Sequence, residues 1–489
     1  MYKLDQSKTP YFKKIKEYGL SNQTQLDVPG HKLGHINNEF REFVGENVFL
    51  IDANAPRGLD NLAKPNGVIK EALELAADAF NADNAYFLVN GTSQGIIAMI
   101  MSAVRANEKI IIPRNVHKSA INGLILSGAM PVFIKPHMDS ELGIANGIIL
   151  SELRETILEN PDAKAVFVIN PTYFGVVSNL KEIVKLAHEY DMMVLVDEAH
   201  GAHFGFHEDL PLSAMEAGAD MSAVSVHKTL GSLTQTSILL TKGDLVSNNR
   251  VRSTLNILQT TSPSSIFMAS LDTARSYMAL NGREKLDDLI KLTSWARDEI
   301  NKIRGFKAIT EDYIYNHKGY GYDPTKIMVK VSDLGITGFD AYNILSKESN
   351  VQVELAETNL VLAVLSIATT KEDLENFILG LKNLKKHKKK TEIRQKIRFT
   401  YPEVFDRPRE AYHAYKKFVK IEDSLNEVSA ESIMVYPPGI PLLIPGEIIN
   451  EDILDDLNFY LDQGSTILSD TKNGYIRVID QDKTYNKED

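Results

Sequence analysis

The sequence predicts an α/β fold: a doubly wound, mostly parallel sheet in a large domain, with smaller α+β domains C-terminal to it. Short apolar runs rich in valine and isoleucine alternate with amphipathic stretches from about residue 68 onward. Strands that alternate with helices are typical of βαβ units, whose strands run parallel. Polar residues able to do chemistry directly follow several of these runs. This placement suits α/β sheets, which bind ligands beyond the carboxyl ends of their strands.

The elements of the large domain can be assigned in order along the chain. A helix is predicted over Val68–Phe80, where apolar residues recur at helical spacing, and another over Leu180–Tyr190. Between and after them lie β-rich runs of the length expected for buried strands. These runs are Tyr86–Val89, Ile110–Ile112, Val132–Ile134, Ala165–Ile169, Met193–Val196 and Ala223–Val226.

The later part of the chain predicts smaller domains. A long helix is expected from Ser264 to Asn281, ending before Gly282, and a further helix over Lys371–Leu384. The lysine-rich run at 384–390 is interpreted as a solvated helix end or linker. The segment YPPGIPLLIPG is expected to be a rigid packed loop, because its prolines disfavour a regular element. The predicted division is an N-terminal arm at 1–67, a large domain at 68–284, a small α+β domain at 285–384 and a C-terminal domain at 397–489.

Composition narrows the class of protein. The 489 residues are 43% hydrophobic and 24% charged, as in globular proteins, and suffice for two or three domains. The net charge of −11 disfavours a nucleic-acid binder, and the absence of cysteine excludes disulfides and thiolate chemistry. The N-terminus lacks an apolar signal-like core, and the longest apolar run, Ile96–Val104, is about half a membrane span. We therefore expect a cytoplasmic protein that does not bind membranes.

Four strand ends carry candidate functional groups. The motif GTSQG follows the first run, Arg114–Ser119 follows the second, Asp197-Glu198-Ala199-His200 follows VLV, and His227-Lys228 follows AVSV. Because the carboxyl ends of parallel strands meet at one sheet edge, we expect these groups to form a site.

Pyridoxal phosphate is a ligand whose needs these groups match. It needs a lysine amine to form an imine with its aldehyde, and Lys228 follows a strand that reads as buried. It needs a carboxylate facing the pyridine nitrogen, which Asp197 offers, and a flat group against the ring, which His117 offers. Its phosphate needs hydroxyl and N–H donors at a helix N-terminus. Candidates for that role are Thr92, Ser93, Gln94, Ser225 and His227.

Other interpretations use some of the same residues. The G-x-S-x-G spacing around Ser93 matches a serine hydrolase, with Asp197 and His200 completing the chain order of a triad. That interpretation leaves Lys228 without a role. A metal site built from His200, His203 and His207 with Asp197 has suitable spacing, but glycines make a helix there doubtful; we expect no metal. A catalytically silent scaffold on the same fold is a further alternative.

A resemblance to a known family supports the cofactor interpretation. The sequence resembles the Orn/Lys/Arg decarboxylase family of fold-type I pyridoxal-phosphate enzymes, and within it the short Gram-positive-type arginine decarboxylases. The matching stretches occur in family order and span most of the chain. They are DVPGHK (27–32), LVNGTSQG (88–95), PRNVHKS (113–119), INPTYFG (169–175), VDEAHGAH (196–203), SVHKTLGSLTQ (225–235), TTSPS (260–264) and YPPGIPLLIPGE (436–447).

The resemblance implies a role for each candidate residue. Lys228 is implied to be the Schiff-base lysine, Asp197 the partner of the pyridine nitrogen, and His117 the residue stacked on the ring. His200 is implied to lie near the ring hydroxyl. The phosphate-binding residues are implied to be Ser93, Gln94, Ser225 and His227. TTSPS is implied to reach the phosphate of a partner subunit in a homodimer.

The implied reaction is α-decarboxylation of a basic amino acid in polyamine synthesis. Arginine giving agmatine is favoured, followed by lysine giving cadaverine and ornithine giving putrescine. The group that recognises the substrate side chain stays open. Glu354 is one candidate, and an acidic residue near Asp60 of a partner chain is another.

Overall fold

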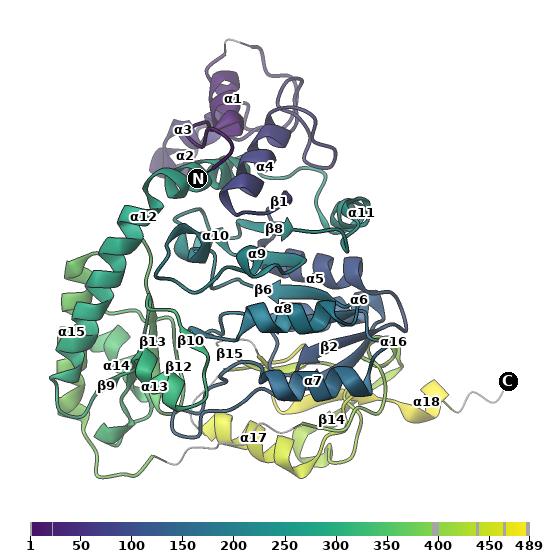
Figure 1. Ribbon diagram of the computed structural model, residues 1–489, viewed down its shortest axis with the longest axis vertical. Helices are drawn as coiled ribbons and strands as arrows, with labels where there is room; N and C mark the ends of the chain where they lie inside the picture. Colours follow the sequence, from purple (N-terminus) through teal and green to yellow (C-terminus); the bar gives the residue numbers. More distant parts are fainter. Residues whose placement is uncertain (1, 22, 394–400, 437–439, 463–465, 486–489) are drawn as a thin grey trace. The chain divides into compact units, whose positions relative to one another are not determined.

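The computed structural model describes residues 2–21, 23–393, 401–436, 440–462 and 466–485 (Figure 1). The chain divides into two compact units, each built from segments far apart in sequence. Unit 1 comprises Met1–Ser102, Met193–Asp288 and Ser366–Ala368, and unit 2 comprises Ala103–Met192, Leu289–Leu365 and Thr369–Asp489.

Unit 1 contains four strands in the hydrogen-bonded order β1-β8-β7-β6, with β6 and β7 parallel and β8 antiparallel to both of its neighbours. Its elements in chain order are α1 (Pro10–Gly19), α2 (Glu39–Val44), α3 (Glu46–Leu50), α4 (Val68–Ala79), β1 (Asn84–Leu88), α5 (Gly91–Ala103), β6 (Met193–Asp197), η1 (Phe204–Phe206), α9 (Ala214–Ala217), β7 (Met221–Val224), α10 (Val226–Thr229), β8 (Ser237–Thr241), α11 (Asn248–Leu258) and the first part of α12 (Ser265–Asn301).

Unit 2 contains the parallel strands β4-β2-β3, a four-stranded antiparallel sheet β12-β13-β11-β9, and small C-terminal sheets. Its elements up to residue 384 are β2 (Lys109–Pro113), α6 (Lys118–Ser127), β3 (Met130–Ile134), α7 (Leu150–Glu159), β4 (Ala165–Ile169), β5 (Val176–Val177), α8 (Leu180–His188), the end of α12, β9 (Lys307–Ala308), α13 (Glu311–Asn316), β10 (Gly321–Tyr322), β11 (Lys326–Lys330), η2 (Ser332–Leu334), α14 (Gly338–Ser349), β12 (Leu355–Ala356), β13 (Leu360–Val364) and α15 (Lys371–Leu384).

The C-terminal part of unit 2 holds two further small sheets, β14-β18 and β16-β15-β17. Its elements are η3 (Lys385–His387), α16 (Pro408–His413), β14 (Lys416–Lys420), η4 (Ile421–Asp423), β15 (Ile433–Tyr436), β16 (Ile440–Leu443), α17 (Glu451–Asp462), β17 (Thr466–Leu468), β18 (Tyr475–Ile479) and α18 (Gln481–Tyr485).

The parallel strands are buried along most of their length. In β2, Ile110, Ile111 and Ile112 are all fully buried, and β4 and β6 are equally apolar. A strand with two buried faces needs a continuous apolar run instead of an alternating one, which is the pattern in the sequence. The predicted α/β fold with a mostly parallel sheet is confirmed.

Most predicted elements match the observed ones within a few residues, and two are wrong in an informative way. The run Ala223–Val226 was expected to be all strand, but β7 ends at Val224 and Val226 opens the short helix α10. The helix predicted to end before Gly282 continues to Asn301. A Cβ at Gly282 would lie 2.9 Å from the Met278 side chain and 3.4 Å from that of Phe206. This glycine therefore permits close packing inside the helix and does not end it.

The C-terminal proline-rich motif is also more regular than expected. The described part of YPPGIPLLIPG includes the end of β15 and all of β16, which pair antiparallel with a register shift between Ile433 and Met434. Residues 437–439 lie outside the described residues. Pro441 is tolerated in a strand because β16 is the edge of its sheet, where a missing N–H leaves no partner unsatisfied. The expected loop is thus wrong for Tyr436 and Ile440–Leu443, which belong to strands.

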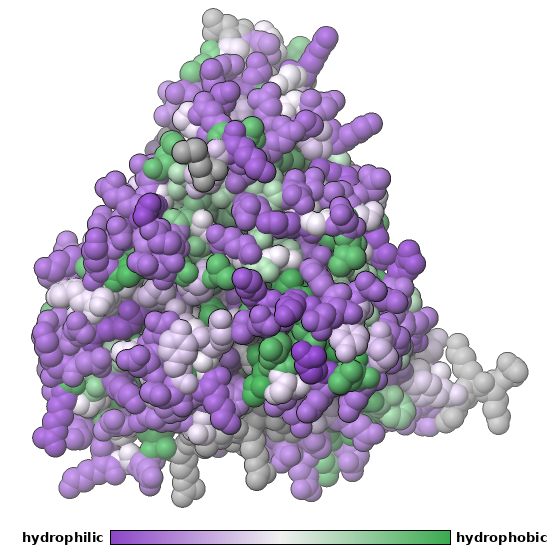
Figure 2. Space-filling view, in the orientation of Figure 1, coloured by the Kyte–Doolittle hydropathy of each residue, from purple (hydrophilic) through white to green (hydrophobic). Residues whose placement is uncertain are grey.

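The face of the protein seen in Figure 2 is largely polar. Figure 2 shows hydrophilic residues over most of the visible face, with hydrophobic side chains in smaller groups. Among the residues that the structure describes, no helix is both long enough and apolar enough to cross a membrane. The lysine-rich run after α15 forms the short turn η3 with no buried residue, so its side chains are solvated as predicted. We retain the four-domain division as a proposal.

Candidate active site

The turn between β1 and α5 is shaped by two glycines. Gly91 has a φ of +71°, a conformation that side chains disfavour, and begins α5 directly after the strand. A Cβ at Gly95 would lie 2.7 Å from Leu88 and 3.1 Å from the Cβ of Ala223, so only glycine lets α5 pack this closely on the strands. Ser93 is exposed in the first turn of this helix. Free N–H groups in such a turn suit an anion.

Beneath this turn, three buried hydroxyl groups tie α5 to β7 and β8. The Oγ1 atom of Thr92 forms a hydrogen bond with the Oγ of Ser225 and lies 2.8 Å from the Oγ of Ser237. All three side chains are almost fully buried. Ser225 therefore lies in contact with the GTSQG turn, as the prediction of a joint phosphate site requires.

Lys228, His200 and Asp197 come together at the ends of β6 and β7. The Nζ atom of Lys228 lies 2.8 Å from the Nε2 atom of His200. Burial raises the pKa of the Asp197 carboxyl, while the nearby Lys228 ammonium opposes that rise. Asp197 Oδ1 also accepts a hydrogen bond of 3.2 Å from the backbone N–H of Ala199. The amine of Lys228, the imidazole of His200 and the buried carboxylate of Asp197 thus lie together at the carboxyl ends of β6 and β7.

His227 has a ring orientation fixed by the backbone. Its Nδ1 atom lies 2.7 Å from the carbonyl oxygen of Thr236, and because a carbonyl only accepts, Nδ1 carries the proton. The other nitrogen, Nε2, is then the one available to a ligand. Burial lowers the pKa of His227, and the positive charge of Lys228 lowers it further. An anion bound beside the ring would oppose both effects.

Glu198, next to Asp197, has a different environment. It is almost fully buried and accepts hydrogen bonds from the N–H of Ala214 at 2.8 Å and from the hydroxyl of Ser222 at 2.7 Å. Burial raises the pKa of Glu198 to about 8. Glu198 is therefore mostly protonated at neutral pH, and it links β6, β7 and α9 without adding a second negative charge beside Asp197.

His117 lies in unit 2, in the loop from β2 to α6. It caps α6, since its Nδ1 atom accepts a hydrogen bond of 3.2 Å from the N–H of Ser119 and lies 2.8 Å from the hydroxyl of that serine. Because Nδ1 is the acceptor, Nε2 carries the proton of the neutral ring. The half-buried ring is held in one orientation by its own helix.

The residues of the alternative sites make other contacts in the structure. His200 Nε2 lies 2.8 Å from Lys228 Nζ, a contact that a triad with Ser93 does not use. His207 Nε2 lies 3.2 Å from the Asp287 carboxylate. No group of three or more histidine, aspartate or glutamate side chains in the described part of the chain is arranged to hold a metal ion.

Comparison with known proteins assigns this arrangement to a family. The model for the major domain of the Orn/Lys/Arg decarboxylases matches residues 9–373, and the model for their C-terminal domain matches residues 391–466. The chain belongs to the Orn/Lys/Arg decarboxylase family.

Individual members of the family resemble this chain over nearly its whole length. The arginine decarboxylase of Bacillus subtilis is 42% identical, covering 98% of this chain and 99% of that protein. The arginine decarboxylase of Halalkalibacterium halodurans is 46% identical over 92% of both chains. The crystal structure of the Francisella novicida lysine decarboxylase LdcF superposes with a TM-score of 0.84 at 25% identity, covering 96% of this chain and 81% of that one. The predicted family and fold type are confirmed.

Unsatisfied polar atoms test whether a cofactor of this family fits. Three buried side chains within two residues of predicted site residues have an oxygen without a hydrogen-bond partner in the described chain. These atoms are Gln94 Oε1, Asn115 Oδ1 and Thr229 Oγ1. Gln94 also contacts Gln259, just before the TTSPS segment, through a weak hydrogen bond of 3.3 Å. Buried polar atoms are rarely left unsatisfied. Gln94 and Thr229, which both lie in unit 1, therefore fit residues prepared for a polar ligand.

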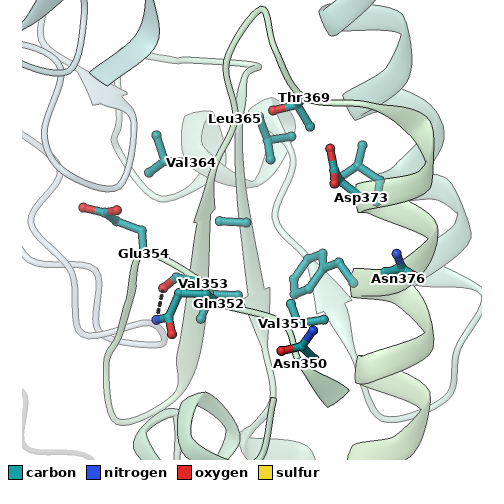
Figure 3. Close-up of a pocket in the computed structure, with 13 residues that line it drawn as sticks. Asn350, Val351, Gln352, Val353, Glu354, Val364, Leu365, Thr369, Asp373 and Asn376 are labelled. Carbon is teal, nitrogen blue, oxygen red and sulfur yellow. Dashed lines mark hydrogen bonds between the residues drawn. The ribbon is translucent and has the colours of Figure 1, made fainter. Parts of the chain in front are cut away.

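Unit 2 also contains a pocket of about 390 Å³ lined by α15, the end of β13 and residues 350–354, which precede β12 (Figure 3). The Val351, Leu365 and Phe377 side chains contribute apolar surface to the pocket, and the exposed carboxylate of Glu354 lies at one side.

Asp60, near which the other candidate carboxylate was expected, has a structural role. Its carboxylate accepts hydrogen bonds from the N–H groups of Asn66, Gly67 and Ile69 at the start of α4.

The sequence analysis did not identify Ser237, and it did not foresee the burial of Glu198. Ser237 begins β8, a strand absent from the predicted set although the run SILLT is apolar. In the sequence, Glu198 has no feature that distinguishes it from an exposed glutamate. Its burial is visible only in the folded protein.

Proposed function

We propose that this protein decarboxylates arginine to agmatine and CO2. Similarity to arginine decarboxylases of 42% and 46% identity over more than nine-tenths of the chain supports this assignment. The similarity to the lysine decarboxylase of known structure is lower, at 25%. Lysine, giving cadaverine, and ornithine, giving putrescine, are the alternative substrates.

We propose pyridoxal 5'-phosphate as the cofactor, whose protonated ring supplies an electron sink for the carbon–carbon bond that breaks. Lys228 is the residue that would bind its aldehyde, and Asp197 would face its ring nitrogen. The burial of Asp197 strengthens its attraction to a positive ring, because the local dielectric is low. His117 is proposed to lie against the ring. The phosphate would be held by Ser93, Gln94, Ser225 and His227.

His200 and Lys228 are proposed to handle the proton of the reaction. The 2.8 Å contact between Lys228 Nζ and His200 Nε2 allows a proton to pass from one nitrogen to the other. Either atom can then deliver the proton that replaces CO2 on the substrate carbon. This contact also holds the lysine amine at a defined place at the end of β7.

Glu354 is proposed to recognise the guanidinium of the substrate. Glu354 offers an exposed carboxylate at the rim of a pocket in unit 2, and an exposed carboxylate suits a cationic head group. A carboxylate and a guanidinium form two parallel hydrogen bonds, which an ammonium does not match. Asp60 is a poorer candidate because its oxygens already accept several backbone N–H groups.

Product identification tests the assignment. The purified protein, loaded with pyridoxal phosphate, is given arginine, lysine and ornithine together at equal concentration. Agmatine is expected as the main product by mass spectrometry. Cadaverine or putrescine in excess would transfer the assignment to lysine or ornithine, and the absence of all three amines would refute it.

Substitution of Glu354 tests head-group recognition. Glu354→Gln is expected to raise KM for arginine at least tenfold, since about 1.4 kcal/mol or more of charge-assisted binding is lost, with a smaller effect on kcat. Glu372→Gln, an exposed residue outside the pocket, serves as the control. An unchanged KM in Glu354→Gln would assign recognition to another residue.

We also propose that the enzyme is a cytoplasmic homodimer that serves polyamine synthesis. In the N-terminal arm, Leu26 and Phe43 are each 90% exposed, and Phe40 is 61% exposed. Large exposed apolar side chains of this kind mark interfaces. The exposed segment Thr260–Ser262 is proposed to reach the partner's phosphate site. Light scattering is expected to give twice the monomer mass, and a monomer carrying full activity would contradict the proposal.

A further inference from the structure

Arg114, at the start of the loop that carries His117, is one of the largest fully buried side chains of the described protein. Its guanidinium forms a two-pronged ion pair with Glu447, with Nε 2.8 Å from Oε1 and Nη2 2.7 Å from Oε2. Both side chains are only 1% exposed. Nη1 also donates to the carbonyl of Pro441 at 2.8 Å, and Nη2 to that of Leu442 at 3.2 Å. The Arg114 guanidinium therefore donates four hydrogen bonds to the C-terminal segment.

Glu447 is also held in place by contacts within the C-terminal segment itself. Its Oε2 atom accepts a hydrogen bond of 2.9 Å from the N–H of Ile444, and its backbone carbonyl accepts one of 2.9 Å from the N–H of Ser429. The preceding Gly446 has a φ of +93°, and a Cβ there would lie 2.0 Å from the carbonyl oxygen of Asp406. The turn that presents Glu447 thus tolerates only glycine at this position. The C-terminal segment offers a rigid carboxylate.

The loop between Arg114 and His117 has little freedom. The Arg114 N–H donates to Ile134 of β3 at 3.2 Å, Val116 is fully buried, and His117 caps α6. Two residues, Asn115 and Val116, separate Arg114 from His117. A shift of Arg114 would therefore be passed to the ring of His117.

We propose that Arg114 and Glu447 are positioning residues through which the C-terminal segment sets the place of His117. The inference rests on the proposed function, in which His117 contacts the cofactor. It assigns a role to the YPPGIPLLIPGE motif, which supplies Pro441, Leu442 and Glu447 but none of the predicted cofactor ligands.

The test measures cofactor dissociation and not activity alone. Arg114→Lys keeps the positive charge but loses the planar guanidinium that forms two parallel hydrogen bonds. The substitution is made both in the natural sequence and in the His117→Ala variant. With His117 present, the dissociation constant for pyridoxal phosphate is expected to rise about tenfold. With His117 absent, the same change is expected to be less than twofold. Glu447→Gln repeats the comparison from the other partner, should Arg114→Lys fold poorly.

Arg409 provides a matched control. It joins the same C-terminal segment to the opposite end of α6, where its Nε atom donates to the Ile125 carbonyl at 2.8 Å and its Nη2 atom donates to Leu126. Arg409→Lys is expected to lower thermal stability while leaving the cofactor dissociation constant within twofold. An effect of Arg409→Lys equal to that of Arg114→Lys would refute a specific role of the Arg114 pair.

Two outcomes separate the inference from the proposed function. Equal effects of Arg114→Lys with and without His117 would show that the pair supports only the fold. If His117→Ala leaves the affinity for pyridoxal phosphate unchanged, His117 does not contact the cofactor. The inference is then tested by the rate at which the His117 ring is chemically modified. Modification of His117 by diethyl pyrocarbonate, followed by peptide mass spectrometry, is then expected to be at least threefold faster in Arg114→Lys. An unchanged rate would overturn the inference.

Discussion

The loops after β7 and after β2 both carry a candidate active-site residue, but they are held in place by different means. After β7, the neighbours of Lys228 are tied to nearby parts of unit 1: His227 to Thr236, nine residues away, and Ser225 to Thr92 in the GTSQG turn. After β2, the loop that presents His117 depends on Glu447, 333 residues further along the chain. The loop after β7 is held by contacts within unit 1, at the ends of neighbouring strands. The loop after β2 is held by a contact with the C-terminal segment.

This difference predicts different consequences of substitution. Changes at His227 and Lys228 should reduce turnover with little loss of stability, because these two side chains are only half-buried. Changes at the Arg114–Glu447 pair should reduce stability strongly, because a broken buried ion pair leaves a charge without solvent.

The largest effect is expected for Lys228→Ala, with turnover falling at least about 10³-fold, since both cofactor attachment and proton transfer depend on its amine. The visible absorbance of the cofactor-loaded protein should be lost as well. Lys242 also follows a strand, but its Nζ donates to the carbonyls of Asn81 and Met215. Lys242→Ala should keep the absorbance and most of the activity. Normal turnover by Lys228→Ala would refute the assignment.

Asp197→Ala is expected to bind some cofactor and to turn over about 10² to 10³ times more slowly, because an unprotonated ring withdraws electrons poorly. Steady-state rates and equilibrium dialysis distinguish the two properties. Rates near those of the natural protein would contradict the electrostatic role of this carboxylate.

At the other loop, Glu447→Leu is expected to lower the free energy of unfolding by about 3–5 kcal/mol, as for other buried ion pairs with one partner removed. Arg114→Met combined with Glu447→Leu should recover most of this loss, because no buried charge is then left unpaired. Urea unfolding measured at several wavelengths gives the comparison. Additive losses in the double variant would show that the two side chains are not energetically coupled.

The smallest effect concerns Glu198 and depends on pH. Its pKa is raised to about 8 in the folded protein from an ordinary value near 4.5, so the folded state binds a proton that the unfolded state releases between these values. The stabilisation from Glu198 is complete below about pH 4.5 and is lost as pH rises through 8, by roughly 1.4 kcal/mol per pH unit at most.

Glu198→Gln mimics the protonated carboxyl and should remove this part of the pH dependence. Its melting temperature relative to that of the natural protein should therefore increase from pH 5 to pH 8. A constant difference across that range would show that Glu198 does not titrate there.

The sequence allowed prediction of most of the first loop and little of the second. Apolar runs followed by Asp197 or Lys228 are local signals, and their meeting follows from the geometry of parallel strands. The burial of Glu198 depends on the residues that cover it, so its raised pKa was not foreseeable. The partnership of Arg114 with Glu447 joins two motifs that were each visible, but nothing in their spacing links them.

The errors in secondary structure have the same origin. Gly282 and Pro441 were interpreted by their local preferences, as the end of a helix and as a loop residue. In the folded chain, Gly282 makes room for Phe206, and Pro441 lies at a sheet edge that needs no donor from it. Tertiary packing decided both positions.

The long sequence separation between Arg114 and Glu447 bears on how the protein is made. A ribosome adds about 5–20 residues per second, so Glu447 emerges roughly 17 to 67 s after Arg114, given a separation of 333 residues. Throughout that interval the nascent chain holds a guanidinium that has not yet met its carboxylate. The β2–α6 loop therefore reaches its final form only near the end of translation, and catalytic competence is expected to be acquired late.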